Sequence, residues 1–240
     1  MKHPIVVLHG WGLSAKIFAP LVAELKKRKF PVFAPDFPGF DSLHIPQAPL
    51  TLSDYAEFLD GYFKKHSIEK PVLIGHSFGG RVALKYQLVY PANVSALVLT
   101  GTPGFTPVSR KKLTVAIAIA KIGGTLFSLP FLYRLKDRVR VWYYYMIGAR
   151  DFYRAEGVMR ETFKNVVKES LVACMENIRV PTLLVWGEDD IIVPVAVAYK
   201  MEKVIHGAKL VVLPREGHNV PFKNSKEFVK TIYDFLCSLS

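Results

Sequence analysis

The chain repeats one pattern along most of its length, in which a short apolar run is followed by a longer helical stretch. The apolar runs are rich in β-branched residues and do not alternate with polar ones, which is typical of strands buried in a parallel sheet. Alternating strands and helices imply right-handed crossovers, so we expect an α/β fold with a mainly parallel sheet of about six strands and helices on both faces. The expected strands are 4–10, 31–37, 71–77, 94–102, 180–188 and 208–214, and the helical stretches lie near 16–29, 51–66, 79–90, 194–205 and 224–239.

The alternation breaks once, after the fourth apolar run. A long interval rich in Phe, Tyr and Trp passes before the fifth run begins. An insertion at this place lies at the carboxyl edge of the sheet, where open α/β sheets bind their ligands. The sequence therefore predicts a core of residues 1–102 and 179–240, with residues 103–178 inserted as a helical cap whose aromatic side chains contribute to an apolar pocket.

Two apolar segments bear on whether the chain is secreted or inserted in a membrane. The first, residues 5–8, is far shorter than the apolar region of a secretory signal. The second, residues 113–132, approaches the length of a membrane span, but Lys121 lies in its middle and Gly123 interrupts it, so two cap helices are expected instead. With only two cysteines in the chain, we predict a cytoplasmic protein without a transmembrane segment.

The formal net charge of +12 is concentrated in one segment. Residues 103–180 hold 14 Lys/Arg and 6 Asp/Glu. No RNA- or DNA-binding motif accompanies them, so no nucleic-acid partner is expected. An acidic carrier protein or an anionic surface fits this charge better. The cap arginines that would receive such a partner are Arg134, Arg138, Arg140, Arg150 and Arg154.

The sequence GHSFGG joins the third strand to the helix after it. It fits G-x-S-x-G in the strand–turn–helix context that a nucleophilic serine requires. A serine on so sharp a turn has a strained backbone, and a Cβ at Gly75 or Gly79 would collide with the neighbouring chain. The pattern therefore predicts Ser77 as a nucleophile, whereas the alternative is a plain tight turn.

A serine hydroxyl needs a base to accept its proton, and neutral histidine suits that role near pH 7. His218 follows the sixth strand, so it falls at the same sheet edge as Ser77. His76 should point away from the nucleophile, and His9 should bond within the loop after the first strand. We therefore predict His218 as the base.

The base in turn needs a carboxylate that fixes its tautomer. Asp36 ends the second strand, and Glu188, Asp189 and Asp190 stand together at the end of the fifth. Position alone does not choose among these four side chains.

Acyl transfer also needs hydrogen-bond donors for the developing oxyanion. The residue after the nucleophile, Phe78, supplies one backbone N–H. In the sequence HGWG, glycines at positions 10 and 12 allow the N–H of Trp11 to turn inward as the second.

Four motifs occur in order along the chain: HGWG, GHSFGG, WGEDDIIVP and EGHNVPF. Together they resemble the α/β-hydrolase fold superfamily over nearly the whole chain outside the cap, and they are most similar to small carboxylesterases, including the pimeloyl-acyl-carrier methyl ester esterases. The resemblance implies that Asp190 is the acid, with Glu188 and Asp189 on the solvent side of the loop. It also implies that the sheet lacks the two first strands of the family, and Asp41 stands where many relatives have glycine.

The combined prediction is a serine esterase that forms an acyl-enzyme on an ester with an apolar acyl group and needs no metal or other cofactor. Carbon–carbon bond hydrolases and cofactor-free haloperoxidases keep the same three residues and are the enzymatic alternative. A ligand-binding protein of the same fold without turnover is the other. A metal hydrolase is disfavoured because the three adjacent acids cannot all face one ion and no H-E-x-x-H motif is present.

Overall fold

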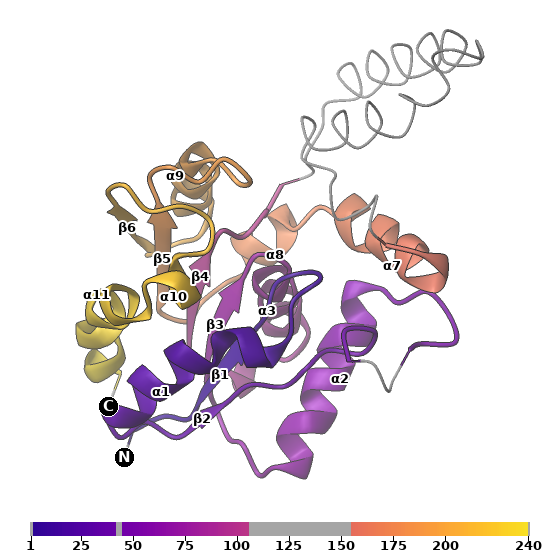
Figure 1. Ribbon diagram of the computed structural model, residues 1–240, viewed down its shortest axis with the longest axis horizontal. Helices are drawn as coiled ribbons and strands as arrows, with labels where there is room; N and C mark the ends of the chain where they lie inside the picture. The colour runs from indigo at the N-terminus through magenta and orange to yellow at the C-terminus, as the bar shows by residue number, and fades with distance from the viewer. Residues whose placement is uncertain (1, 42–44, 106–154, 240) are drawn as a thin grey trace, which may run out of the picture.

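The protein, seen in a computed structural model, is described for residues 2–41, 45–105 and 155–239, and its centre is an open twisted sheet (Figure 1). The sheet has six strands, all parallel, in the order β2-β1-β3-β4-β5-β6. This confirms the predicted fold class, and each expected run contains one observed strand. The strands are β1 (Ile5–Leu8), β2 (Val32–Phe33), β3 (Val72–His76), β4 (Ala96–Thr100), β5 (Thr182–Gly187) and β6 (Lys209–Leu213).

Helices cover both faces of this sheet, as the alternation predicts (Figure 1). One face is covered by α1 and α11, and the other by α2, α3, α8 and α9. Four of the helices fall within the predicted stretches, and a fifth, α3, begins one residue before its stretch. The helical elements are η1 (Ala15–Phe18), α1 (Ala19–Lys27), α2 (Leu52–Lys65), α3 (Phe78–Val89), η2 (Pro91–Asn93), α7 (Gly157–Lys168), α8 (Val172–Glu176), α9 (Val195–Val204), α10 (Val220–Lys223) and α11 (Ser225–Ser238).

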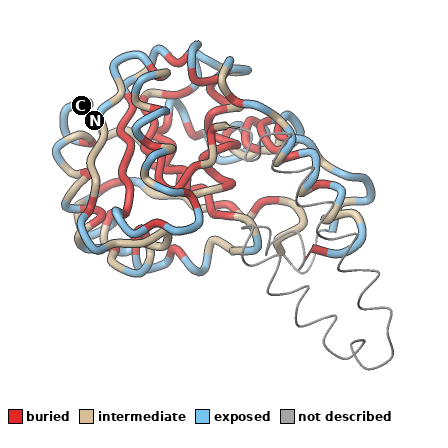
Figure 2. The backbone as a smooth tube through the Cα atoms, turned by 90° about the horizontal axis from the view of Figure 1, so that it is seen from above, coloured by how far each residue is buried: buried red, intermediate tan, exposed pale blue. Residues whose placement is uncertain are grey.

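Two apolar clusters, one on each side of the sheet, form the core. Figure 2 shows the buried residues concentrated in the interior of the molecule. In β1, Val6 and Leu8 belong to the cluster under α2 and α3, whereas Ile5 and Val7 belong to the cluster under α1 and α11. Successive side chains of a strand point to opposite faces, so a run apolar at every position serves both clusters. This explains why the sequence runs do not alternate.

The two edge strands differ from the expectation that every strand is buried. β1, β3, β4 and β5 are buried throughout, but both residues of β2 are only half-buried and β6 begins with the exposed Lys209. An edge strand has a neighbour on one side only, so fewer elements cover it.

Helix α2 illustrates how local sequence fixes an element boundary. The Thr51 hydroxyl accepts a hydrogen bond from the Asp54 N–H, and the Asp54 carboxylate accepts one from the Thr51 N–H at 2.6 Å. This reciprocal capping box satisfies amide groups that the first helical turn leaves without partners.

Part of the predicted cap lies outside the described residues, including the segment 113–132 and all five cap arginines named above. In the described part of the chain, no helix has the length and apolar character needed to cross a membrane. Of the two cysteines, Cys174 is buried in α8 and Cys237 is exposed on α11. Burial raises the pKa of the Cys174 thiol.

Candidate active site

Ser77 occupies a sharp turn between β3 and α3. Its φ of 52° and ψ of −113° lie where L-residues other than glycine are rarely found. The turn depends on close backbone packing: a Cβ on Gly75 would lie 2.5 Å from the Gly80 Cα, and one on Gly79 would lie 2.2 Å from the Leu8 carbonyl oxygen. The predicted strand–turn–helix geometry is therefore present, with Ser77 partly exposed at the carboxyl end of β3.

Asp190 and His218 form a hydrogen-bonded pair. His218 Nδ1 donates to Asp190 Oδ2 at 2.7 Å. The other carboxylate oxygen, Oδ1, accepts from the N–H groups of Ile192 at 2.9 Å and Val193 at 2.8 Å. Because Asp190 is only 4% exposed, these bonds fix its orientation. The pairing also places the His218 proton on Nδ1, which leaves Nε2 as the acceptor.

The other carboxylates considered from the sequence lie elsewhere. Glu188 and Asp189 are both exposed, on the solvent side of the loop. Asp36 accepts a hydrogen bond from the Ala15 N–H at 2.5 Å, and its Oδ1 lies 3.9 Å from His9 Nε2. Of these four acids, only Asp190 is bonded to His218.

The loop after β4 brings Ser77 and His218 to the same place. Ser77 N donates to the Thr100 carbonyl at 2.9 Å, and the next residue, Gly101, packs against the His218 ring so tightly that a Cβ there would lie 2.6 Å from Cε1. In the described structure Ser77 Oγ and His218 Nε2 are not joined by a hydrogen bond. Such bonds often tighten only in the complex with substrate.

His76 has a place in the site that the sequence did not predict. Its Nε2 donates to the His218 carbonyl at 3.0 Å, and the two rings lie 4.8 Å apart. Burial, followed by the neighbouring His218, lowers the pKa of His76 to about 3, so the ring is neutral at physiological pH. His76 thus holds the backbone of the residue predicted as the base. In the sequence, only its position directly before Ser77 marks His76 as a residue of the site.

His9 is structural, as expected. Its Nδ1 donates to the Gly10 carbonyl at 2.8 Å, and its Nε2 accepts from the Phe37 N–H at 3.0 Å. Burial lowers its pKa. The ring thereby joins the loop after β1 to the loop after β2.

The two residues predicted to supply the oxyanion donors are in contact through their side chains. The rings of Trp11 and Phe78 are in edge-to-face contact with centroids 5.4 Å apart. Among the hydrogen bonds of the described residues, the N–H groups of Trp11 and Phe78 have no acceptor.

A pocket of about 470 Å³ opens beside Trp11. Its described walls come from the loop after β1, from Phe40 in the loop after β2, and from Met159 in α7. The only charged side chain among the described lining residues is that of Glu156. Asp41, which departs from the resembled pattern, follows Phe40 directly in the chain.

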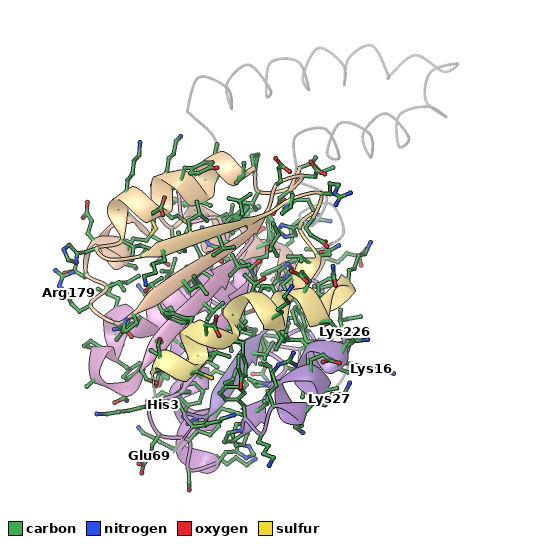
Figure 3. All side chains as sticks on the ribbon, turned by 90° about the vertical axis from the view of Figure 1, so that its left-hand side faces the viewer. His3, Lys16, Lys27, Glu69, Arg179 and Lys226 are labelled. Carbon is green, nitrogen blue, oxygen red and sulfur yellow. The ribbon has the colours of Figure 1, made fainter. Side chains whose placement is uncertain are left out.

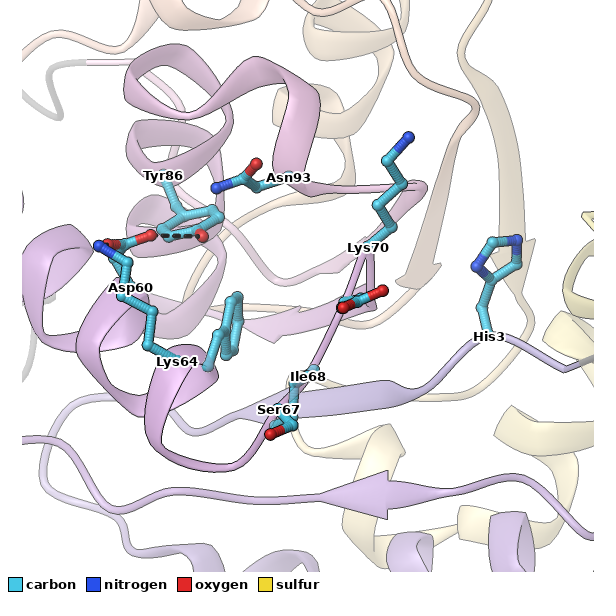
Figure 4. A pocket seen from close by; sticks show the side chains of 10 residues that line it. His3, Asp60, Lys64, Ser67, Ile68, Lys70, Tyr86 and Asn93 are labelled. Atoms are coloured by element: carbon cyan, nitrogen blue, oxygen red, sulfur yellow. Dashed lines mark hydrogen bonds and ion pairs between the residues drawn. The ribbon is translucent and has the colours of Figure 1, made fainter.

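A larger hollow of about 660 Å³ lies at the opposite edge of the sheet, where the strands begin (Figure 4). Two of its charged groups are paired: Asp60, which accepts from the Tyr86 hydroxyl at 3.3 Å, lies 2.7 Å from Lys64 Nζ. None of the predicted site residues lines it. We therefore place the candidate active site at the carboxyl edge. Across the described residues, no group of three His, Cys, Asp or Glu side chains is arranged to hold a metal ion.

Comparison with known proteins identifies the family. The sequence model of the alpha/beta hydrolase family matches residues 5–231. The chain belongs to the alpha/beta hydrolase family. Its fold, with six parallel strands, and its esterase-like relatives agree with the resemblance drawn from the four motifs.

The relatives of this alpha/beta hydrolase carry different activities in their names. A 2-hydroxy-6-oxononadienedioate/2-hydroxy-6-oxononatrienedioate hydrolase from Paraburkholderia phymatum is 29% identical, with 98% of this chain and 87% of that protein covered. Monoacylglycerol lipase ABHD6 from Homo sapiens is 30% identical, with 99% of this chain and 76% of that protein covered. An esterase from Exiguobacterium antarcticum superposes with a TM-score of 0.75 at 21% identity, covering 98% of this chain and 93% of that one, which supports the fold alone.

Proposed function

We propose that this alpha/beta hydrolase cleaves carboxylic esters through an acyl-enzyme formed on Ser77. The observation that carries the proposal is the hydrogen bond between the buried Asp190 and His218 at the sheet edge where Ser77 stands on its strained turn. A serine, a histidine with a free Nε2 and a carboxylate on Nδ1 are the three parts that nucleophilic acyl transfer requires.

In the proposed mechanism, Ser77 Oγ attacks the ester carbonyl carbon while His218 Nε2 takes its proton. Asp190, fixed by two backbone N–H groups, stabilises the imidazolium that forms. The bond to the alcohol then breaks, and His218 returns the proton to the departing oxygen. Water repeats the sequence on the acyl-enzyme, which releases the acid and restores Ser77.

The N–H groups of Trp11 and Phe78 would hold the oxyanion during both attacks. Their lack of acceptors in the described structure supports this role. Loss of one such donor typically costs about 3 kcal/mol of barrier, a hundredfold or more in rate.

The described walls of the pocket beside Trp11 favour an uncharged, apolar acyl group. Trp11, Phe40 and Met159 supply apolar surface, and Glu156 would repel a substrate carboxylate nearby. We therefore propose a small neutral ester as the substrate class.

Cleavage of a carbon–carbon bond is the second candidate, and the names of the relatives favour it. A 2-hydroxy-6-oxo dienedioate contains no ester, so its hydrolysis must break a bond between carbons. Such a substrate is a dianion at neutral pH, and among the described lining residues of the pocket there is no Lys, Arg or His to meet it. This favours the ester.

A phosphonate probe and two substrates test these proposals. The probe should label the protein at Ser77, and labelling and p-nitrophenyl ester turnover should both disappear in Ser77→Ala but persist in Ser238→Ala, whose serine is exposed on α11. Absence of labelling would instead indicate a binding protein of the same fold. Faster turnover of a 2-hydroxy-6-oxo dienoate than of any ester would select the second candidate.

Three expectations from the sequence stay proposals: the division into core and cap, a cytoplasmic location, and an acidic carrier protein or anionic surface as partner. The cap arginines lie outside the described residues. On the described surface, Lys16, Lys27 and Lys226 share one side of the molecule (Figure 3). Lys27 is paired there with Glu24 at 2.6 Å, which weakens its attraction for an anionic partner.

A further inference from the structure

A buried arginine stands one helical turn after the proposed nucleophile. Arg81 in α3 is 2% exposed, and its N–H donates to the Ser77 carbonyl at 3.3 Å. Burial lowers the pKa of its guanidinium to about 10, which keeps the charge at neutral pH. A buried charge is costly unless its hydrogen bonds are satisfied. The hydrogen-bond acceptors of this guanidinium therefore show which segments Arg81 holds in place.

Three main-chain carbonyls from two segments receive the guanidinium. Nη1 donates to the Pro103 carbonyl, and Nη2 donates to the carbonyls of Val166 at 2.7 Å and Glu169 at 2.5 Å. Val166 lies in the last turn of α7, and Glu169 is its C-cap. A helix leaves its last four carbonyls without intrahelical partners, and a cation there also opposes the negative end of the helix dipole. Arg81 therefore caps α7.

The opposite end of α7 forms a wall of the pocket beside Trp11. Met159 lines that pocket and lies against Gly39, where an added Cβ would be 2.4 Å from its sulfur. Phe163 contacts the Trp11 ring edge to face at 5.0 Å. The position of α7 thus sets the distance between this wall and a proposed oxyanion donor.

The third carbonyl belongs to the segment that supports the proposed base. Pro103 is two residues after Gly101, whose Cα packs against the His218 ring. One guanidinium on α3 is consequently bonded to the pocket-wall helix and to the segment behind His218. Its planar fork of donors can serve several carbonyls at once, which a lysine ammonium cannot reproduce in the same geometry.

We propose that Arg81 is a positioning residue that sets substrate size, by holding α7 in register with the nucleophile turn. The predicted effect on substrate size rests on the proposed ester hydrolysis. The predicted effect on the position of α7 does not. Loss of the guanidinium should let α7 shift, which weakens binding of acyl groups long enough to reach Met159. Short acyl groups, which stay near Ser77, should be affected much less.

The test compares p-nitrophenyl esters of two-carbon and eight-carbon acids in four proteins: wild type, Arg81→Gln, Arg81→Lys and Arg179→Gln. Arg179 also donates to main-chain carbonyls but is exposed, so it is a matched control. Arg81→Gln should raise KM for the long ester by about tenfold, equivalent to one charged hydrogen bond. Any fall in kcat from release of the Pro103 carbonyl should be similar on both esters, so kcat/KM should fall about tenfold more on the long ester than on the short one. Arg81→Lys should fall between, and Arg179→Gln should match wild type.

Equal losses on both esters, or no change in KM, would overturn the proposal. Where Arg81→Gln does not fold, the Arg81→Lys comparison decides in the same way. If the wild type hydrolyses no ester, the proposed function is wrong, and amide hydrogen exchange then tests the positioning role of Arg81 by itself. The amides of α7 should then exchange about tenfold faster in the Arg81 variants than in Arg179→Gln. Unchanged protection of α7 would refute the positioning role.

Discussion

Asp190 Oδ2 accepts a hydrogen bond from His218 Nδ1 at 2.7 Å, while Asp189, its neighbour in the chain, faces solvent. Asp190→Asn should therefore lower kcat by about 10⁴, because an amide that donates to Nδ1 selects the wrong imidazole tautomer. Asp189→Asn should leave most of the activity. Steady-state ester kinetics of the two variants check this, and similar losses in both would contradict the assignment.

Gly101 allows the close approach of the loop after β4 to the His218 ring. In Gly101→Ala the new Cβ would meet Cε1 at 2.6 Å, and alanine would also be strained at a φ of 55°. We expect a loss of about 1–2 kcal/mol in the free energy of unfolding from the backbone strain, together with a large fall in kcat from the displaced ring.

Gly207→Ala is the matched control for this glycine. Its φ is 72°, but no atom lies within 4 Å of the added Cβ. It should show the loss of stability without the loss of kcat. Urea unfolding and ester kinetics separate the two effects, and equal kcat values in the two variants would contradict a steric role for Gly101.

The buried His76 predicts how stability depends on pH. Its pKa is lowered in the folded state from 6.5 to about 3, so below pH 6.5 the unfolded chain takes up a proton that the folded chain does not. Stability is therefore lost as the pH falls, at up to about 1.4 kcal/mol per pH unit from this residue. Urea unfolding between pH 6.5 and 5 measures the slope. His76→Gln should reduce this slope of stability against pH by the contribution of about one proton. An unchanged slope would argue against a neutral buried ring.

Trp186 supports the loop that carries Asp190. Its indole Nε1 donates to the Val193 carbonyl at 2.8 Å, and the N–H of Val193 binds Asp190 Oδ1. Trp186→Phe should cost about 1–3 kcal/mol of stability, because a buried carbonyl loses its donor. It should also lower kcat by loosening the carboxylate. A variant with an unchanged melting temperature and kcat would show that the loop does not depend on this bond.

The fold was predictable because it depends on patterns local to each segment. Continuously apolar runs such as Ile5 to Leu8 follow from burial on both faces, and the turn at Ser77 follows from glycines whose added Cβ atoms would meet the backbone. Edge strands were predicted less well, because a run of residues does not say how many neighbours its strand will have. β6 is the example.

The contacts around the site were less predictable, because they join residues far apart in the chain. His76 and His218 are separated by 142 positions, and Arg81 reaches Glu169 across 88. No local pattern marks such pairs. The choice of Asp190 among adjacent acids came from the family resemblance, and burial in the folded loop gives a physical basis for it.

The two ends of the described chain meet on the side of the molecule away from Ser77. His3 Nε2 donates to the Leu239 carbonyl at 3.1 Å, and Figure 1 shows the termini side by side. A short linker could therefore join them without crossing the sheet, and the exposed turn at His206 and Gly207 offers a place to open the chain. A circular permutant built in this way would keep every contact of the candidate site while reversing the order in which Ser77 and His218 leave the ribosome.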